Sequence, residues 1–464
     1  MQQFRLPTAR DRHVKPQIYK DKLIDLLSGD LDFHDQDGRL ASHNFHAFPA
    51  KFPPQLPQKF IANLTESRAV VLDPMLGSGT TILEAFLTGR AGIGFDIDPL
   101  ALRIAQVKVT SLDIPCVHRL ANTILTQAQK TAQLHRDRLQ TDLKRRWDEE
   151  TQSFVDYWFT QDTQIALLAL LEEIAKINEE VIRSFFEIAF SAIIITKSGG
   201  VSLALDLAHT RPHRAKIVMN REGEVVLGSQ MNLASSRAKL LTKTLRSPFD
   251  EFAKRVQQNI KGIVPKDSSK IQPSIEFGDI QNLPLPDSAV DLVVTSPPYA
   301  SNAIDYMRAH KFSLVWFGYT VSDLGERRGK YIGGEALKDN VLEPLPSKVA
   351  AGVAAITDLD RRKGIVLHRY YAEMTRALSE MFRVLKPGKA AIVVVGSSVM
   401  RGKDTETAEC LAEIGRAVGF EVPPIGVRQL DRNRRMLPAS TTRNLTSQIQ
   451  NRMHEEYVIG FYKP

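Results

Sequence analysis

Two short segments, far apart in the chain, carry residue types that could bind and orient a small molecule. The first, Asp73-Pro-Met-Leu-Gly-Ser-Gly-Thr-Thr81, combines a carboxylate with two glycines. The second, Thr295-Ser-Pro-Pro-Tyr299, combines hydroxyls, two rigid rings and an aromatic side chain. Glycine lets a backbone approach a ligand closely, and consecutive prolines stiffen a loop while leaving its carbonyls free. The first segment therefore suits a nucleotide-like ligand, and the second suits a flat ring that bears an amino group.

Both segments follow apolar runs that are typical of buried strands. Ala69–Leu72 precedes the first, and Val293 and Val294 lead into the second, where two prolines cannot continue a strand ladder. Thr80–Thr88 has the pattern of a helix that ends at Gly89. Strand, glycine turn and helix open a nucleotide-binding βαβ unit, and ligands of such sheets bind at the carboxyl ends of the strands. The turn is not a phosphate-binding P-loop, because no lysine follows its second glycine.

Two acidic residues indicate which nucleotide-like ligand is bound. Asp96 ends the next strand, near the spacing of about 20 residues at which an acid binds ribose hydroxyls. Asp73 lies beside the glycines, where it would disfavour the pyrophosphate of a dinucleotide but tolerate a cationic amino-acid nucleoside. These residues favour S-adenosyl-L-methionine over a nicotinamide cofactor, and a dehydrogenase would leave Asp73 and Thr295–Tyr299 unexplained.

Composition bounds the class of protein. The chain has 464 residues, of which 43% are hydrophobic, enough for a large core and more than one domain. A formal net charge of +8 is compatible with a polyanionic partner. The two cysteines, Cys116 and Cys410, form no disulfide framework or paired metal motif, which suits a reducing compartment. We expect a cytoplasmic protein, since no apolar run is long enough to span a bilayer and no signal core is visible at the N-terminus.

The α/β alternation occupies two separate stretches. We expect an N-terminal extension at 1–42, a cofactor-binding part at 43–111, a helical insertion at 112–272 and a catalytic part at 273–464. Within the insertion, Leu120–Glu150 has the pattern of one long helix, and Lys216–Leu227 that of a β-hairpin. Gly318–Gly364 has poor periodicity and is expected to be a long loop.

The two segments resemble motifs of the amino-group DNA methyltransferases. Asp73–Thr81 is similar to the cofactor motif of that family, and Thr295–Tyr299 to its catalytic motif, in the Ser-Pro-Pro-Tyr form common among N4-cytosine enzymes. Weaker matches are Phe48–Pro53, Asp96, Asp279 and Leu385–Gly388. The resemblance covers roughly 45–110 and 273–464. It implies a Rossmann-like class I methyltransferase sheet, here with a large mainly helical insertion between its second and third strands.

The resemblance also implies a mechanism. The exocyclic amine of a flipped base attacks the methyl group directly, while Ser296 Oγ and the Pro297 carbonyl accept its hydrogens. Pro297 and Pro298 fix the loop before substrate binds, and Tyr299 stacks on the base. No cysteine nucleophile is required, and Pro115-Cys116 lies in the wrong place for the nucleophile motif of C5-cytosine enzymes.

The implied cofactor site has named roles. Asp96 takes the ribose hydroxyls, Asp279 the adenine amino group, Asp73 the ammonium and Lys51 the carboxylate. The full expected set is Lys51, Asp73, Pro74, Gly77, Ser78, Gly79, Thr80, Thr81, Asp96, Asp279 and Thr295. We expect no metal, because His43 and His46 have metal-like spacing but no third ligand nearby.

The segment that recognises the target remains open between three candidates. They are the helical insertion with its basic stretch Arg136–Arg146, the stretch Gly318–Gly364, and an arginine-rich loop at 431–452. The loop residues expected to contact DNA are Arg432, Arg434, Arg435 and Arg443. A solvated surface is the alternative interpretation of each basic stretch.

The expected partner is double-stranded DNA, with a restriction endonuclease as a functional counterpart. Alternatives are an adenine-N6 DNA methyltransferase, an RNA amino-group methyltransferase, and a nucleic-acid-binding protein with a vestigial cofactor fold. The RNA enzymes usually carry Asn or Asp in place of Ser296 and add an RNA-binding domain. The target sequence and the oligomeric state do not follow from the sequence.

Overall fold

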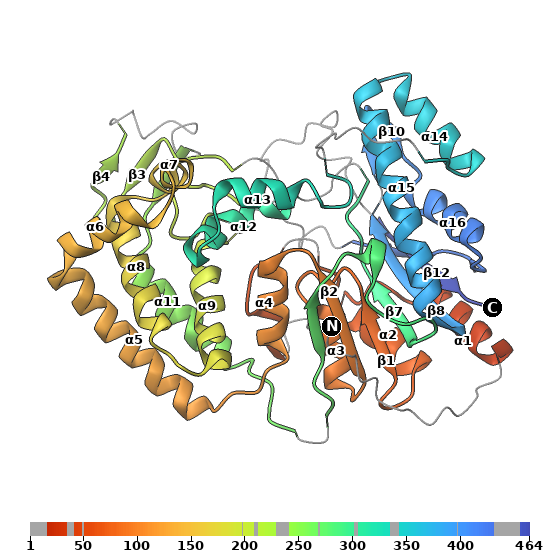
Figure 1. Ribbon diagram of the computed structural model, residues 1–464, viewed down its shortest axis with the longest axis horizontal. Helices are drawn as coiled ribbons and strands as arrows, with labels where there is room; N and C mark the ends of the chain where they lie inside the picture. Colours follow the sequence, from red (N-terminus) through yellow and green to blue (C-terminus); the bar gives the residue numbers. More distant parts are fainter. Residues whose placement is uncertain are drawn as a thin grey trace.

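A computed structural model of the chain describes residues 16–34, 41–48, 51–196, 198–207, 212–228, 241–267, 270–300, 305–334, 343–396, 398–430 and 455–464. A seven-stranded sheet with helices on both faces lies in one half of the molecule, and a mainly helical block lies in the other (Figure 1). In chain order the strands of the sheet are β1 (Val70–Asp73), β2 (Ala91–Asp96), β6 (Ser274–Phe277), β7 (Val290–Thr295), β8 (Leu385–Gly396), β11 (Gly426–Gln429) and β12 (Glu455–Tyr462).

The strand order places the two motifs side by side. The sheet runs β11-β12-β8-β7-β1-β2-β6, with β12 antiparallel to both of its neighbours and parallel pairing from β8 to β6. The order reverses between β1 and β7, where Val71 pairs with Leu292 and Leu72 with Val293. Ligands of doubly wound sheets bind at this reversal point. The predicted Rossmann-like α/β fold class is confirmed.

Helices cover both faces of the sheet. One face carries α1 (Pro16–Ser28), α2 (Gln55–Leu64), α3 (Thr80–Leu87) and α4 (Pro99–Lys108). The other face carries α15 (Arg361–Val384) and α16 (Thr407–Val418), and α14 (Ser347–Thr357) packs against these two helices. Val71 and Val294 belong to the core beneath α1 and α2, whereas Leu72 and Val293 belong to the core beneath α15 and α16. This alternation follows from the period of two in a strand, and it makes the sheet the middle of three layers.

The helical block lies between α4 and β6 in sequence. Its helices are α5 (Ile114–Leu134), α6 (Arg136–Arg146), α7 (Glu149–Trp158), α8 (Gln161–Ala175), α9 (Glu180–Ile194) and α11 (Pro248–Ile260). Beside them lies a small sheet of β3 (Ile217–Met219), β4 (Val225–Leu227) and β5 (Thr242–Thr244), in which β3 and β4 form the predicted hairpin. No helix in the described ranges could cross a membrane.

Two sequence-based expectations about helices are wrong. Leu120–Glu150 is not one helix, because Trp147 is extended and Asp148 caps the new helix α7 by accepting from the Thr151 N–H at 2.8 Å. Gly318–Gly364 is not a loop in its described part, because it contains α13 (Val321–Arg328), α14 and the start of α15. The Thr320 and Asp360 side chains cap α13 and α15 in the same way.

The segment Tyr306–Phe317, which follows the catalytic motif in the chain, packs against the helical block. It forms α12 (Tyr306–Leu314) and η3 (Val315–Phe317), which lie with α13 between the sheet and the block (Figure 1). Trp316 is fully buried in the core of the block, with its ring edge-on to Trp147. The Trp147 indole N–H donates to the Val315 carbonyl at 2.9 Å. The inserted helices therefore support the segment that leads away from the active-site loop.

Candidate active site

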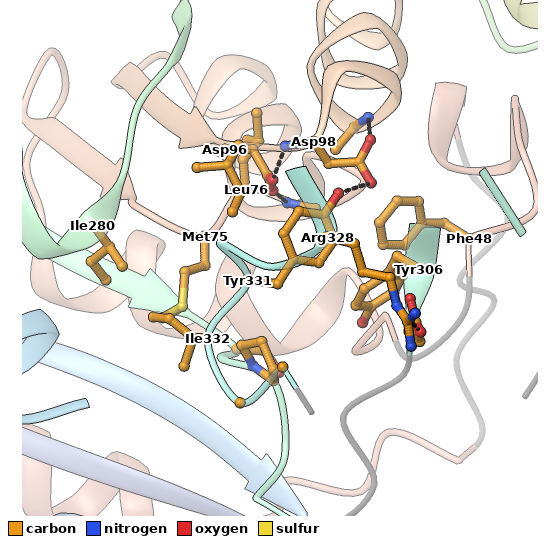
Figure 2. A pocket seen from close by; sticks show the side chains of 18 of the residues that line it. Phe48, Met75, Leu76, Asp96, Asp98, Ile280, Tyr306, Arg328, Tyr331 and Ile332 are labelled. Carbon is orange, nitrogen blue, oxygen red and sulfur yellow. Dashed lines mark hydrogen bonds and ion pairs between the residues drawn. The ribbon is translucent and has the colours of Figure 1, made fainter. Parts of the chain in front are cut away.

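The site lies at the carboxyl ends of β1, β2, β6 and β7. A cavity of about 250 Å³ opens there, and residues of both motifs line it. Asp73, Asp96, Asp98 and Asp279 supply carboxylates to it, while Phe48 stacks on Tyr306 in the opposite wall at 5.0 Å between ring centroids. Figure 2 shows Asp96 and Asp98 on one side of the space and Phe48, Tyr306 and Arg328 on the other. An acidic cavity with aromatic walls suits a cationic nucleoside.

The glycine turn is held against β2 and α4. The Gly77 N–H donates to Asp96 Oδ2 at 2.7 Å, and the Leu76 N–H donates to the Phe95 carbonyl at 2.9 Å. Gly79 has φ +76°, and a Cβ there would lie 2.6 Å from Ala105 Cβ. Glycine is required at this position both by the left-handed backbone and by the close approach of α4. The turn is consequently fixed before any ligand arrives.

Within the described residues, neither the buried Asp73 nor the half-buried Asp96 forms an ion pair with a cationic side chain. Burial raises the pKa of Asp73 to about 6, although the Thr295 hydroxyl donates to it at 2.7 Å. Burial, together with the neighbouring Asp98, raises the pKa of Asp96 to about 7. A buried carboxylate without a cation is costly in its charged form. A ligand that brings a positive charge would stabilise these groups, so the residues present fit S-adenosyl-L-methionine.

The catalytic motif is only partly exposed to the cavity. Ser296 and Pro298 line it, but Tyr299 is 7% exposed and packs in the core with Ala300 and Ile332. The Tyr299 hydroxyl donates to Glu456 Oε1 on β12 at 3.1 Å. The stacking role expected of Tyr299 stays a prediction, and it would require the ring to leave this position.

The structure brings most of the expected site residues to one cavity. Those that line it are Lys51, Asp73, Pro74, Gly77, Ser78, Thr80, Asp96, Asp279, Ser296 and Pro298. The lining does not include Gly79, Thr81, Thr295, Pro297 and Tyr299. The expected DNA contacts Arg432, Arg434, Arg435 and Arg443 lie outside the described residues.

Asp98 is a site residue that the sequence did not single out. Its Oδ1 caps α4 by accepting from the N–H groups of Leu100 and Ala101, and its Oδ2 accepts from His310 Nδ1 at 2.6 Å and from the Tyr331 hydroxyl at 3.0 Å. An Asp-Pro pair before an apolar stretch signals a helix cap, but no local pattern indicates the two distant partners. Asp98 thus joins the cofactor strand to α12 and to the segment after α13.

Lys108 is a second residue near the site that the sequence does not indicate. It is wholly buried on α4 and donates to the Ser78 carbonyl in the glycine turn at 2.6 Å. Burial lowers its pKa well below the ordinary value. A lone lysine at the end of a helix carries no signal of such a contact in the sequence.

The two histidines with metal-like spacing have separate partners. His43 Nε2 lies 2.7 Å from Glu84 Oε1, and His46 Nε2 lies 2.8 Å from Ser191 Oγ. Within the described ranges, no group of three or more histidine, cysteine or acidic side chains could hold a metal ion. These contacts attach the segment before α2 to α3 and α9.

The sheet topology and the acidic cavity at its reversal point define a class I methyltransferase. A family profile described as DNA methylase, for N6 and N4 enzymes, matches residues 29–107. The Type II methyltransferase M.MvaI of Kocuria varians is 22% identical over 428 residues, which are 87% of each chain. M.BsoBI of Geobacillus stearothermophilus is 23% identical over 82% of this chain and 78% of its own.

Similarity to solved structures adds nothing to the fold assignment. A DNA modification methylase of Thermus thermophilus, solved with S-adenosyl-L-methionine, is 20% identical and covers 40% of this chain and 54% of its own, with a TM-score of 0.21. The fold class is assigned from the strand order β11-β12-β8-β7-β1-β2-β6. The profile match and these relatives support an amino-group DNA methyltransferase family for this chain. S-Adenosyl-L-methionine is the cofactor of this family.

Proposed function

We propose that this protein is a site-specific DNA methyltransferase that methylates the exocyclic N4 amine of a cytosine flipped out of the duplex. The observation that carries the proposal is the position of Ser296, which lines the same cavity as Asp73 because β7 and β1 are adjacent. A base amine that reaches Ser296 would then face a cofactor held by the Asp73–Thr81 turn.

The residues of the catalytic loop would act by accepting hydrogen bonds. When bound, the cofactor would supply an electrophilic methyl group on a sulfonium, whose transfer to the amine leaves a neutral thioether while the amine gives up one proton to solvent. Ser296 Oγ and the Pro297 carbonyl would accept the amine hydrogens, which releases the nitrogen lone pair from conjugation with the ring. The rigid Pro297-Pro298 backbone keeps these acceptors in place before the base arrives. No covalent intermediate with the enzyme is needed, and neither cysteine lines the cavity.

The cofactor roles follow the charges of the cavity. Asp73 would receive the ammonium and Asp96 the ribose hydroxyls, both from strand ends that the structure holds in place. Asp279 would accept from the adenine amino group. Lys51 would meet the carboxylate, since its Nζ is fixed at the cavity wall by a 2.8 Å bond to the His43 carbonyl.

Cytosine N4 is favoured because the residue before the two prolines of the catalytic motif is Ser296 rather than the aspartate that many relatives carry. A hydroxyl accepts one amine hydrogen without adding a charge beside the base. Adenine N6 is the second candidate, because its amine presents the same geometry to this loop. The matched relatives are named Type II methyltransferases, and we extend to this chain a functional pairing with a restriction endonuclease.

Nucleoside analysis tests the proposal. The purified protein is incubated with the cofactor and either unmethylated duplex DNA, tRNA or rRNA, and the digested nucleosides are measured by mass spectrometry. We expect N4-methylcytosine from duplex DNA, clustered at one sequence when the sites are mapped. N6-methyladenine would overturn the choice of base, and methylation of RNA alone would overturn the choice of DNA.

A further inference from the structure

The cavity is lined by cationic side chains as well as by acids. Three of these cations, here called the basic rim, come from α12, α13 and the segment after α13: they are Arg308, Arg328 and Lys330. We propose that the basic rim binds a backbone phosphate of the DNA strand next to the flipped nucleotide. This inference rests on the proposed function, and it adds the residues that would hold the strand while the base occupies the cavity.

The two arginines of the basic rim share one carboxylate. Arg308 Nε lies 2.8 Å from Asp305 Oδ2, and Arg328 Nε lies 2.6 Å from the same oxygen. Two cations on one anion leave a surplus positive charge. The closest atom is Nε in both pairs, and within the described residues the structure gives the terminal nitrogens of these two guanidinium groups no ion pair of their own. The edge formed by those nitrogens can therefore bind another acceptor. That edge matches two phosphate oxygens.

Lys330 supplies a further cation. It is exposed, and it forms no ion pair with any residue in the described ranges. A lysine ammonium acts as a point charge for an incoming phosphate. Together with the two arginines it gives the basic rim a net charge of about +2 after Asp305 is counted, by adding unit charges.

The backbone beneath the basic rim is anchored. The Tyr331 hydroxyl donates to Asp98 at 3.0 Å, and the Gly333 N–H donates to Glu373 Oε2 at 2.9 Å. Arg369 Nη2 donates to the Gly329 carbonyl at 3.2 Å. Figure 2 shows Tyr331 directed at Asp98, with Arg328 turned the other way, beside Tyr306. A charge on a fixed segment loses less entropy when it binds than one on a free chain.

The anion at the basic rim is better assigned to DNA than to the cofactor. The acids at the strand ends attract the cationic end of the cofactor, whereas Arg328 is 44% exposed. The basic rim lines the same cavity as Ser296, so an anion bound there would lie beside a base that reaches Ser296. The cofactor carboxylate is also an anion that arginine and lysine can bind, and the experiment below distinguishes it from a DNA phosphate.

Salt-dependent DNA binding tests the basic rim in the full-length protein. The variants are Lys330→Gln and the double variant Lys330→Gln/Arg308→Gln, with Lys22→Gln on the exposed side of α1 as the matched control. Each phosphate contact contributes a slope of about −0.9 to a plot of log K against log salt. We expect the slope to become shallower by about one for each cation removed. Between 50 and 200 mM salt, Lys330→Gln should therefore lose about 3-fold less affinity than the wild type, and the double variant about 12-fold less. The control should keep the wild-type slope.

Calorimetry with S-adenosyl-L-methionine completes the test. We expect the variants to bind the cofactor as the wild type does, within about twofold, and to show a raised KM for DNA. An unchanged salt slope would overturn the inference, and an unchanged slope with weaker cofactor binding would assign the basic rim to the carboxylate instead. A wild-type protein that methylates no DNA would overturn the proposed function, whereas a wild type that methylates DNA beside variants with unchanged slopes would overturn the basic rim alone.

Discussion

Thr295 Oγ1 donates a 2.7 Å hydrogen bond to Asp73 Oδ1, which joins residues 222 positions apart at the tips of β7 and β1. Both side chains are buried. The bond connects the catalytic segment to the cofactor segment directly, so the distance between a bound base and a bound cofactor depends on it. It also stabilises the ionised form of Asp73 against the cost of burial.

Replacement of Thr295 by valine should weaken cofactor binding in a pH-dependent way. Asp73 is charged above its pKa of about 6, and a cationic ligand prefers the charged form, so affinity should rise as pH increases through this value. Loss of the hydroxyl raises the pKa of Asp73 further, and the midpoint of the affinity profile should move upward by about one pH unit. Calorimetry between pH 5 and 8 measures the midpoint. An identical profile for Thr295→Val and for the surface control Thr123→Val would contradict the role of the bond.

Gly79 in the glycine turn and Gly89 after α3 offer a matched pair of substitutions. Gly79→Ala places a Cβ 2.6 Å from Ala105 Cβ at φ +76°, whereas Gly89→Ala has nearly the same φ, +74°, with no atom within 4 Å. Gly89→Ala should lower the free energy of unfolding by only about 1 kcal/mol, the strain of an alanine in the left-handed region. Gly79→Ala should cost several kcal/mol and reduce cofactor affinity, because the turn and α4 must separate. Thermal unfolding and calorimetry measure both effects, and equal losses in the two variants would show that the contact with Ala105 is unimportant.

Removal of the Ser296 hydroxyl should slow methyl transfer without affecting the cofactor. Ser296→Ala deletes one hydrogen-bond acceptor for the amine, and we expect kcat to fall about 100-fold, as for the loss of one positioned hydrogen-bonding group elsewhere. Cofactor affinity should stay within about twofold of the wild type, since the residues assigned to the cofactor are untouched. Single-turnover kinetics and calorimetry give the two values. The exposed Ser379→Ala is the control, and a Ser296→Ala enzyme with a full rate would remove Ser296 from the mechanism.

Acid stability should depend on His46. Burial lowers its pKa to about 3, so the unfolded chain takes up a proton below about pH 6.5 while the folded protein does not. The stability contributed by this group is therefore complete above pH 6.5 and is lost as the pH falls toward 3. Between pH 7.5 and 5 the free energy of unfolding of the wild type should fall by about 2 kcal/mol more than that of His46→Gln, because glutamine has no proton to gain. The change in melting temperature over this range measures the difference, and the exposed His213→Gln should behave as the wild type. A His46→Gln variant with the same acid sensitivity would show that His46 does not govern it.

The fold was predictable where local rules determine it. The glycine turn of Asp73–Thr81 and the prolines of Thr295–Tyr299 each end a strand, and the alternation of strands and helices identified the α/β class. Helix boundaries were less predictable. Leu120–Glu150 and Gly318–Gly364 were assigned by periodicity, whereas the capping side chains of Asp148, Thr320 and Asp360 decide where helices begin.

The sequence by itself determined that two chemically suited segments end strands, because apolar runs, glycines and prolines act on their own neighbours. Only the tertiary structure decided that these strands are adjacent and that Tyr299 turns toward Glu456. It also decided that Asp98 accepts hydrogen bonds from both His310 and Tyr331. These relationships depend on the packing of segments that are distant in the chain. Such packing is set by burial summed over the whole core rather than by any local pattern.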